Sequence, residues 1–167
     1  VLEKDVAGLR SLDSAWTQIG QLAVLLGHTD HRADLRSGIE VDFFSHQLFK
    51  CFEEKIDDLR TAIFLTVMKE TLDATREGGW TSPEDSFDAF RNSFLRFCDN
   101  QAGGDYEPFT VEQAKILTKH VAETFYRFFS SFKYAFSQDQ DRDTVSEDVF
   151  VEEPMAALPL SLAKRRS

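Results

Sequence analysis

The chain has 167 residues, of which 42% are hydrophobic, and its 29 acidic and 19 basic side chains give a formal net charge of −10. This excess of negative charge disfavours binding to nucleic acids and to anionic membranes, and the length suits one folded domain with a tail. No uninterrupted apolar run approaches the roughly 20 residues that span a bilayer, and two cysteines are too few for a disulfide scaffold.

The first expected element is a helix over residues 1–27 that ends at Gly27. We expect this helix to pack in an intramolecular bundle. The alternative is an intermolecular coiled coil, for which a length of about three heptads is the lower limit. Its apolar residues follow heptad spacing, interrupted only at Asp5, and are Leu2, Leu9, Leu12, Trp16, Ile19, Ala23 and Leu26.

The polar connection over residues 28–36 contains two histidines, His28 and His31, and two aspartates, Asp30 and Asp34. Histidines three residues apart with nearby carboxylates are a ligand set for a divalent transition metal. Further ligands would have to come from other helices, so we expect a solvent-exposed connection and no metal site.

The central prediction is one long helix over residues 37–76, because this run contains no proline and no glycine after Gly38. Ser37 and Glu40 have the spacing of a capping box, and Gly78 with Gly79 predicts the end. At about 1.5 Å per residue this helix would be roughly 58 Å long. Its apolar face comprises Val41, Phe44, Leu48, Phe52, Ile56, Leu59, Ile63 and Val67.

Two more helices are expected, over residues 83–100 and 111–137. Ser82 and Pro83 are typical of a helix start, and Thr110 with Gln113 forms a second capping box. Both helices have phenylalanine-rich apolar stripes, which indicate a tightly packed core. The predicted inward stripe of the last helix comprises Ala114, Leu117, Val121, Phe125, Phe128, Phe132 and Ala135.

An acidic tail over residues 138–167 is expected to be largely disordered. Its D-x-D-x-D series lacks the glycine and the final glutamate of an EF-hand loop, so it does not predict calcium binding. The alternative is an acidic segment that docks on a basic surface through Val149, Phe150 and Val151.

These elements predict an all-α fold, most simply an up-down-up-down four-helix bundle over residues 1–137 with one long central helix. The third helix would cover only half of the central one, which leaves Phe43, Phe44 and Leu48 to be covered by another helix or by another protein. Cys51 and Cys98 would lie too far apart for a disulfide, so we expect two free, buried thiols.

No nucleophile elbow, phosphate-binding glycine loop or zinc-protease motif is present, so neither enzyme activity nor a cofactor is predicted. We predict an intracellular helical protein–protein interaction module, such as a scaffold, an adaptor or a complex subunit. Its partner would be a protein with a basic surface or an amphipathic helix, or a second copy of the chain. The expected contact residues are Leu9, Leu12, Trp16, Ile19, Phe43, Phe44, Leu48, Val149, Phe150 and Val151.

A second hypothesis is a small-molecule binding protein, because the phenylalanine stripes could enclose a cavity for a lipid, haem or pigment. His46 or His120 would then be the polar contact. We expect a cytoplasmic location, with a processed organellar protein as the alternative because the chain begins at Val1 rather than at a methionine.

Overall fold

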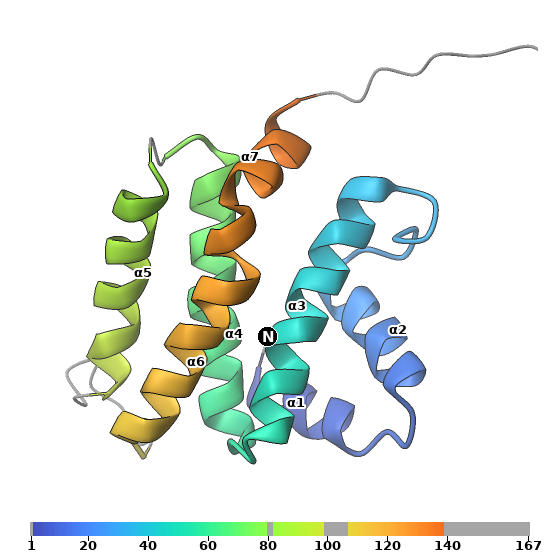
Figure 1. Cartoon of the computed structure of the whole chain (residues 1–167). Coiled ribbons are helices and arrows are strands. Elements are labelled where there is room, and N and C mark those ends of the chain that lie inside the picture. Colours follow the sequence, from blue (N-terminus) through green and yellow to red (C-terminus); the bar gives the residue numbers. More distant parts are fainter. Residues whose placement is uncertain (1, 80–81, 99–106, 139–167) are drawn as a thin grey trace, which may run out of the picture.

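The computed structural model describes residues 2–79, 82–98 and 107–138, and in that part of the chain every regular element is helical (Figure 1), which confirms the all-α prediction. Predictions about residues 139–167, including Val149, Phe150 and Val151, fall outside the described residues. The elements in chain order are α1 (Glu3–Arg10), α2 (Ala15–Leu26), α3 (Leu35–Glu53), α4 (Asp58–Arg76), α5 (Pro83–Cys98), α6 (Val111–Thr124), the 3-10 helix η1 (Tyr126–Phe128) and α7 (Phe129–Ser137).

The single central helix predicted over residues 37–76 is wrong, because the chain forms two helices, α3 and α4, that run in opposite directions (Figure 1). Just after α3, Lys55 adopts a left-handed φ of 55°. The Lys55 amide donates to the Phe52 carbonyl at 3.1 Å, and the Ile56 amide donates to the Cys51 carbonyl at 3.0 Å. These two bonds form a Schellman motif, in which the left-handed residue is usually glycine.

The residues after Lys55 contain a signal for this break. Asp57 is the N-cap of α4, and its carboxylate accepts a hydrogen bond from the Arg60 amide at 2.9 Å. The side chain of Ile56, which is 1% exposed, provides the hydrophobic contact that accompanies the motif. Because the chain reverses here, the expected mismatch between a long central helix and its neighbours does not arise.

Replacing Lys55 with glycine is expected to raise the free energy of unfolding by about 0.5–1 kcal/mol, because glycine adopts the left-handed conformation without a steric cost. Urea unfolding of the two proteins measures the difference. The control Glu70→Gly, at an exposed position inside α4, is expected to lower stability by about 1 kcal/mol. A destabilised Lys55→Gly protein would contradict the role given to this residue.

The helix predicted over residues 1–27 is also divided, into α1 and α2. Ser14 is the N-cap of α2 and accepts a hydrogen bond from the Trp16 amide at 3.3 Å, and Gly27 ends this helix as predicted. The heptad stripe does not form one seam, since Leu9 is fully buried whereas Trp16 is 76% exposed. In this structure α1 packs on α4 and α2 packs on α3.

Two predicted helix starts are confirmed. The Ser82 hydroxyl accepts a hydrogen bond from the Asp85 amide at 3.1 Å, and Pro83 is the first residue of α5. Thr110 and Gln113 form the expected capping box of α6. Both starts depend on residues within one helical turn, which is why the sequence was sufficient to find them.

The predicted capping box of Ser37 and Glu40 does not form. Helix α3 begins earlier, with Asp34 as its N-cap, and the Asp34 carboxylate accepts a hydrogen bond from the Ser37 amide at 2.8 Å. A hydrogen bond from the Ser37 hydroxyl, together with this one from the Ser37 amide, lowers the pKa of Asp34. Glu40 instead points into the protein, where it is 3% exposed.

The helix predicted over residues 111–137 is interrupted by η1, so that α6 and α7 are separate helices. A 3-10 helix has three residues per turn, so it rotates the following side chains relative to those of a continuous α-helix. Phe128, which the sequence placed on the inward stripe, is therefore 50% exposed.

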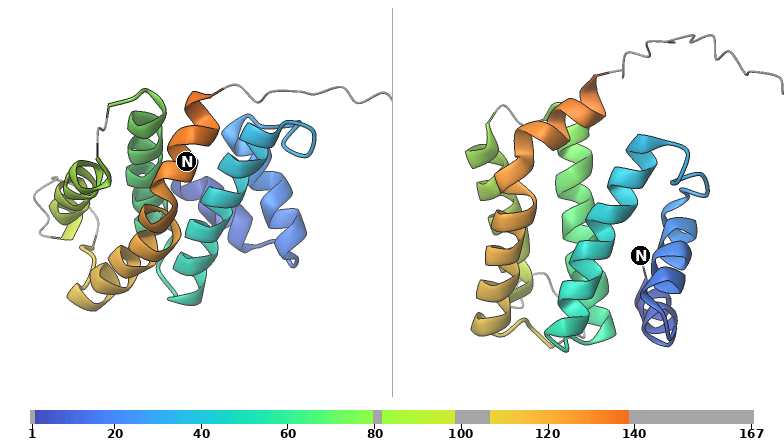
Figure 2. Two further views of the ribbon diagram at one scale, coloured as in Figure 1. Left: turned by 45° about the horizontal axis from the view of Figure 1, so that its top comes forward. Right: turned by 45° about the vertical axis from the view of Figure 1, so that its right-hand side comes forward.

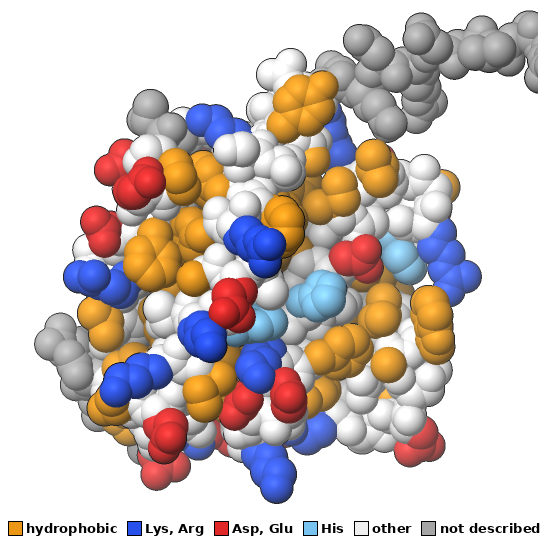
Figure 3. Space-filling view, in the orientation of Figure 1, with side chains coloured by type: hydrophobic (Ala, Val, Ile, Leu, Met, Phe, Trp, Pro, Cys, Tyr) orange, Lys and Arg blue, Asp and Glu red, His pale blue; other side chains and the backbone are white. Residues whose placement is uncertain are grey.

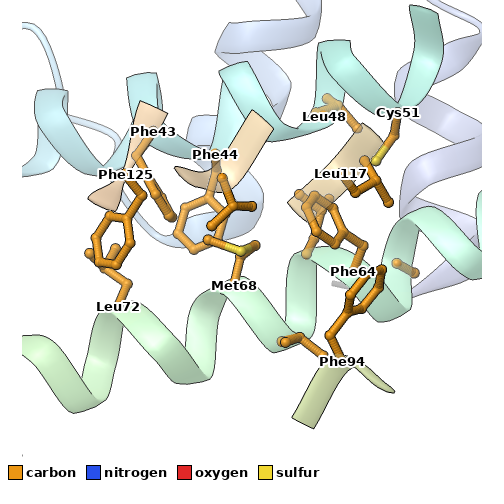
Figure 4. Packing of buried hydrophobic residues seen from close by; sticks show 14 of the residues in the cluster. Phe43, Phe44, Leu48, Cys51, Phe64, Met68, Leu72, Phe94, Leu117 and Phe125 are labelled. Carbon is orange, nitrogen blue, oxygen red and sulfur yellow. The ribbon is translucent and has the colours of Figure 1, made fainter. Parts of the chain in front are cut away.

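The largest part of the core lies between the α3–α4 hairpin and α5, α6 and α7 (Figure 4), and the buried Val6 and Leu9 of α1 and Leu22 of α2 extend it. Edge-to-face ring contacts join these layers: Phe64 of α4 lies 5.6 Å from Phe94 of α5, and Phe43 of α3 lies 5.4 Å from Phe125 at the end of α6. In Figure 2, α1 and α2 lie beyond α3, on the side of the molecule opposite α5. The four regions predicted as helices all contribute to this core, but three of them are divided into shorter helices.

The two cysteines differ in burial. Cys51 is completely buried, and burial raises the pKa of its thiol to about 12. A reactive cysteine instead has a lowered thiol pKa and is partly exposed. Cys98 is only partly buried, and its thiol donates to the Phe94 carbonyl at 3.6 Å. The prediction of a buried thiol is therefore confirmed for Cys51 and wrong for Cys98.

Candidate interaction surface

A surface groove of about 520 Å³ runs between α3 on one side and α6, η1 and α7 on the other. Figure 3 shows this face, where hydrophobic side chains over α7 and α2 are separated by histidine and carboxylate side chains. The lining residues of the groove are Ile39, Asp42, Phe43, His46, Gln47, Glu123, Thr124, Phe128, Ser131, Phe132 and Ala135.

The α3 wall of the groove is one face of that helix, because its five lining residues recur every three or four positions. The buried Phe43 lies at the bottom, with its ring 5.6 Å from the ring of Phe132. Phe125 packs beneath both, at 5.4 Å from Phe43 and 5.2 Å from Phe132. A firm aromatic layer therefore supports a groove whose upper edge includes the half-exposed Phe128.

One buried polar side chain lines the groove, that of Gln47, which is 0% exposed. Its amide nitrogen lies 3.5 Å from the Thr124 hydroxyl, which itself donates to the His120 carbonyl at 2.7 Å. Because that hydroxyl proton is already used, Thr124 accepts from Gln47, and this fixes the orientation of the amide. The Gln47 Oε1 atom has no hydrogen-bond donor among the described residues, which costs about 1–3 kcal/mol for a buried acceptor.

His120 lies next to this group on α6 and is partly buried. Burial lowers its pKa, and the nearby charges of Lys50 and His46 lower it further. Its Nε2 atom is also buried without a partner in the described part of the chain. The neutral imidazole is therefore the favoured form, and the formal charges of the groove come from other residues.

Two carboxylates, those of Asp42 and Glu123, line the groove and are exposed, whereas its lining includes no lysine or arginine. Glu123 lies 3.8 Å from Lys119, one turn back on α6, and both side chains are well solvated. Such an exposed pair contributes little to stability and leaves the Glu123 carboxylate accessible to another cation. The groove is thus apolar with a negative edge.

A second hollow of about 310 Å³ adjoins the groove on the other side of α3. Asp42 lines both cavities, so α3 forms the ridge between them. Trp16 of α2, which is 76% exposed, lies at this hollow. The other lining residues are Ile19, Gly20, His31, Arg32 and Gly38.

The structure separates the predicted contact residues into three groups. Leu9, Phe43, Phe44 and Leu48 belong to the core, and Phe43 also lines the groove. Other helices of the chain cover Phe43, Phe44 and Leu48, which is one of the two alternatives that the sequence left open. Leu12 and Ile19 are partly buried and Trp16 is exposed, and Trp16 and Ile19 line the second hollow. Val149, Phe150 and Val151 lie outside the described residues.

Sequence reasoning did not find the α7 wall of the groove. Phe128 and Phe132 were assigned to a continuous inward stripe, and nothing in the local sequence marks the 3-10 turn that exposes Phe128. Ser131 and Ala135 are small residues on the same face, which leaves room between α7 and α3.

The histidines of the α2–α3 connection contact protein groups in this structure. His28 Nε2 lies 3.2 Å from Glu40 Oε2, and His31 Nδ1 lies 3.1 Å from the His28 carbonyl oxygen. No group of three or more His, Cys, Asp or Glu side chains within residues 2–79, 82–98 and 107–138 is placed to hold a metal ion. None of the described helices is both long enough and apolar enough to cross a membrane.

Comparison with known families gives one match. The model of the family described as "CLAMP: Flagellar C1a complex subunit C1a-32" matches residues 42–144, which is more than half of the chain. The matched range runs from Asp42 through α7 and so includes most of both walls of the groove. No curated protein sequence matches the chain. The extent of the family match shows that the chain belongs to the CLAMP family.

Proposed function

We propose that the chain is a non-enzymatic subunit of a flagellar C1a-type complex and that the groove between α3 and α7 is where it attaches to the rest of that complex. The family description names a complex subunit, which supports membership in a larger assembly. The observation that carries the attachment site is an apolar groove with a half-exposed phenylalanine, located in the part of the chain that the family model matches. Exposed apolar surface of this kind marks protein–protein contacts.

This function places the chain on the cytoskeletal framework of a flagellum, which is a more specific location than the cytoplasm. The groove is lined mainly by apolar side chains and by small residues that admit a partner closely, as in grooves that bind helices. Trp16 and the second hollow extend the same face across α3, so a partner that fills the groove could also contact α2.

The test uses a tagged full-length chain in a flagellated cell and a pair of neighbouring serines on α7. Ser131 lines the groove and Ser130 does not, and both are exposed. Ser131→Arg is expected to prevent attachment by filling the groove, whereas Ser130→Arg adds the same side chain without effect. The measurement is the fraction of the chain that stays with detergent-extracted flagella and then sediments with other complex subunits after salt extraction.

Retention of the wild-type chain and of Ser130→Arg, with loss of Ser131→Arg to the detergent-soluble fraction, is the expected result. A wild-type chain found only in the soluble fraction would contradict membership in the complex. Equal retention of the two arginine variants would contradict the groove as the attachment site. Circular dichroism of the purified variants checks that both retain the helical fold.

A further inference from the structure

We infer that the groove between α3 and α7 binds an amphipathic helix of another subunit, with basic residues beside its apolar face. This inference rests on the proposed function, because it names the kind of partner that occupies the proposed attachment site. Two independent features of the groove support it: its walls and its charge.

The walls favour a helix over an extended segment. Both sides of the groove are helices, whose backbone groups are already hydrogen-bonded, so there is no strand edge to pair with an extended chain. The backbone groups of an extended segment would therefore find no backbone partners on either wall, whereas a helix satisfies its own backbone groups internally. The α3 wall extends from Ile39 to Gln47, about 12 Å, which matches two turns of a docked helix.

The charge favours a basic partner. Asp42 lies on the α3 wall and Glu123 on the α6 wall, so a docked helix would have a carboxylate on each side. The lining includes no lysine or arginine, and the whole chain has a formal net charge of −10. Lysine or arginine residues that flank an apolar stripe would therefore meet opposite charge on both sides, and an acidic helix would be repelled.

The test measures fluorescence anisotropy of labelled synthetic helices with the full-length chain. The basic probe is a peptide of about 18 residues, or five turns, with leucines at helical spacing and lysines beside them. The acidic probe has glutamate at every lysine position. We expect binding of the basic probe and at least about tenfold weaker binding of the acidic probe.

Two double variants distinguish binding in the groove from non-specific electrostatic attraction to the chain. Asp42→Lys with Glu123→Lys reverses both groove carboxylates, and Asp13→Lys with Glu70→Lys makes the same change in net charge at exposed positions outside the groove. The groove variant is expected to bind the basic probe at least about tenfold more weakly than the matched variant does. Equal losses in the two variants would overturn the inference, because they would show non-specific attraction.

A second copy of the chain is the other candidate occupant of the groove. A wild-type chain that forms a dimer in light scattering, and becomes a monomer with Ser131→Arg, would also overturn the inference, because the groove would then be occupied by a second copy.

Failure of this inference is distinguishable from failure of the proposed function. In flagellated cells, Asp42→Lys with Glu123→Lys is expected to detach from the complex as Ser131→Arg does. If Ser131→Arg detaches and the charge-reversed chain is retained, the groove is the attachment site but its partner is not a basic helix. If neither variant detaches, the proposed attachment site itself is wrong.

Discussion

Replacing Phe125 with alanine is expected to lower the free energy of unfolding by about 3–5 kcal/mol, the typical cost of removing a fully buried phenylalanine. Phe125 is 0% exposed and follows the last residue of α6, where the chain passes into η1. Its ring lies 4.9–5.8 Å from four other aromatic rings, in contacts that connect α3, η1 and α7, and these are the rings of Phe43, Tyr126, Phe129 and Phe132.

The loss of the Phe125 ring also removes the layer beneath the groove, so we expect Phe125→Ala to weaken binding of the basic helical probe. Urea unfolding gives the stability change. Phe128→Ala is the matched control, because Phe128 is three residues away but 50% exposed, and its truncation is expected to cost less than about 1.5 kcal/mol. Equal costs for the two substitutions would contradict the packing described here.

Replacing Glu40 with glutamine is expected to lower the free energy of unfolding by about 2 kcal/mol. The Glu40 carboxylate is 3% exposed, accepts a hydrogen bond from Arg76 at the end of α4, and lies 3.2 Å from His28 Nε2. The Arg76 guanidinium also lies over the ring of Phe136 in α7, at 4.8 Å from the ring centroid. This group therefore connects the start of α3, the end of α4 and α7.

The expected cost is below the 3–5 kcal/mol of a completely buried pair because the Arg76 side chain is 40% exposed and can turn toward water when its partner is lost. A double-mutant cycle with Arg76→Met measures the coupling between the two side chains. The control is Asp73→Asn, which removes a solvated pair with Lys69 and is expected to cost less than about 0.5 kcal/mol. A Glu40→Gln cost as small as that of the control would contradict a structural role for the buried carboxylate.

The sequence by itself determined the fold class and several helix ends, since these depend on interactions within one or two turns. The apolar period of three and four residues predicted helices throughout the described chain. The capping residues Ser82 and Thr110 and the left-handed glycines Gly27 and Gly78 marked where helices begin and end. Each of these signals acts on neighbouring backbone groups, so no knowledge of distant contacts was needed.

Tertiary structure alone decided where the long apolar stripes are broken. Lys55 takes a left-handed conformation that a non-glycine residue rarely adopts, and the burial of Ile56 helps to compensate for its cost. The period of apolar residues continues across this turn, so the sequence pattern resembles one helix although the chain forms a hairpin. Phe43, Phe44 and Leu48, which belong to the core, were consequently predicted as partner contacts.

The groove was decided by tertiary structure in the same way. Its two walls are separated by about 80 residues in sequence. They meet only because the chain forms α4 and α5 and then returns to α3 through α6 and α7. The exposure of Phe128 depends on the rotation introduced by η1, and the burial of Gln47 depends on its contact with Thr124. The sequence supplied the side chains of the site, but long-range packing determined which of them face outward.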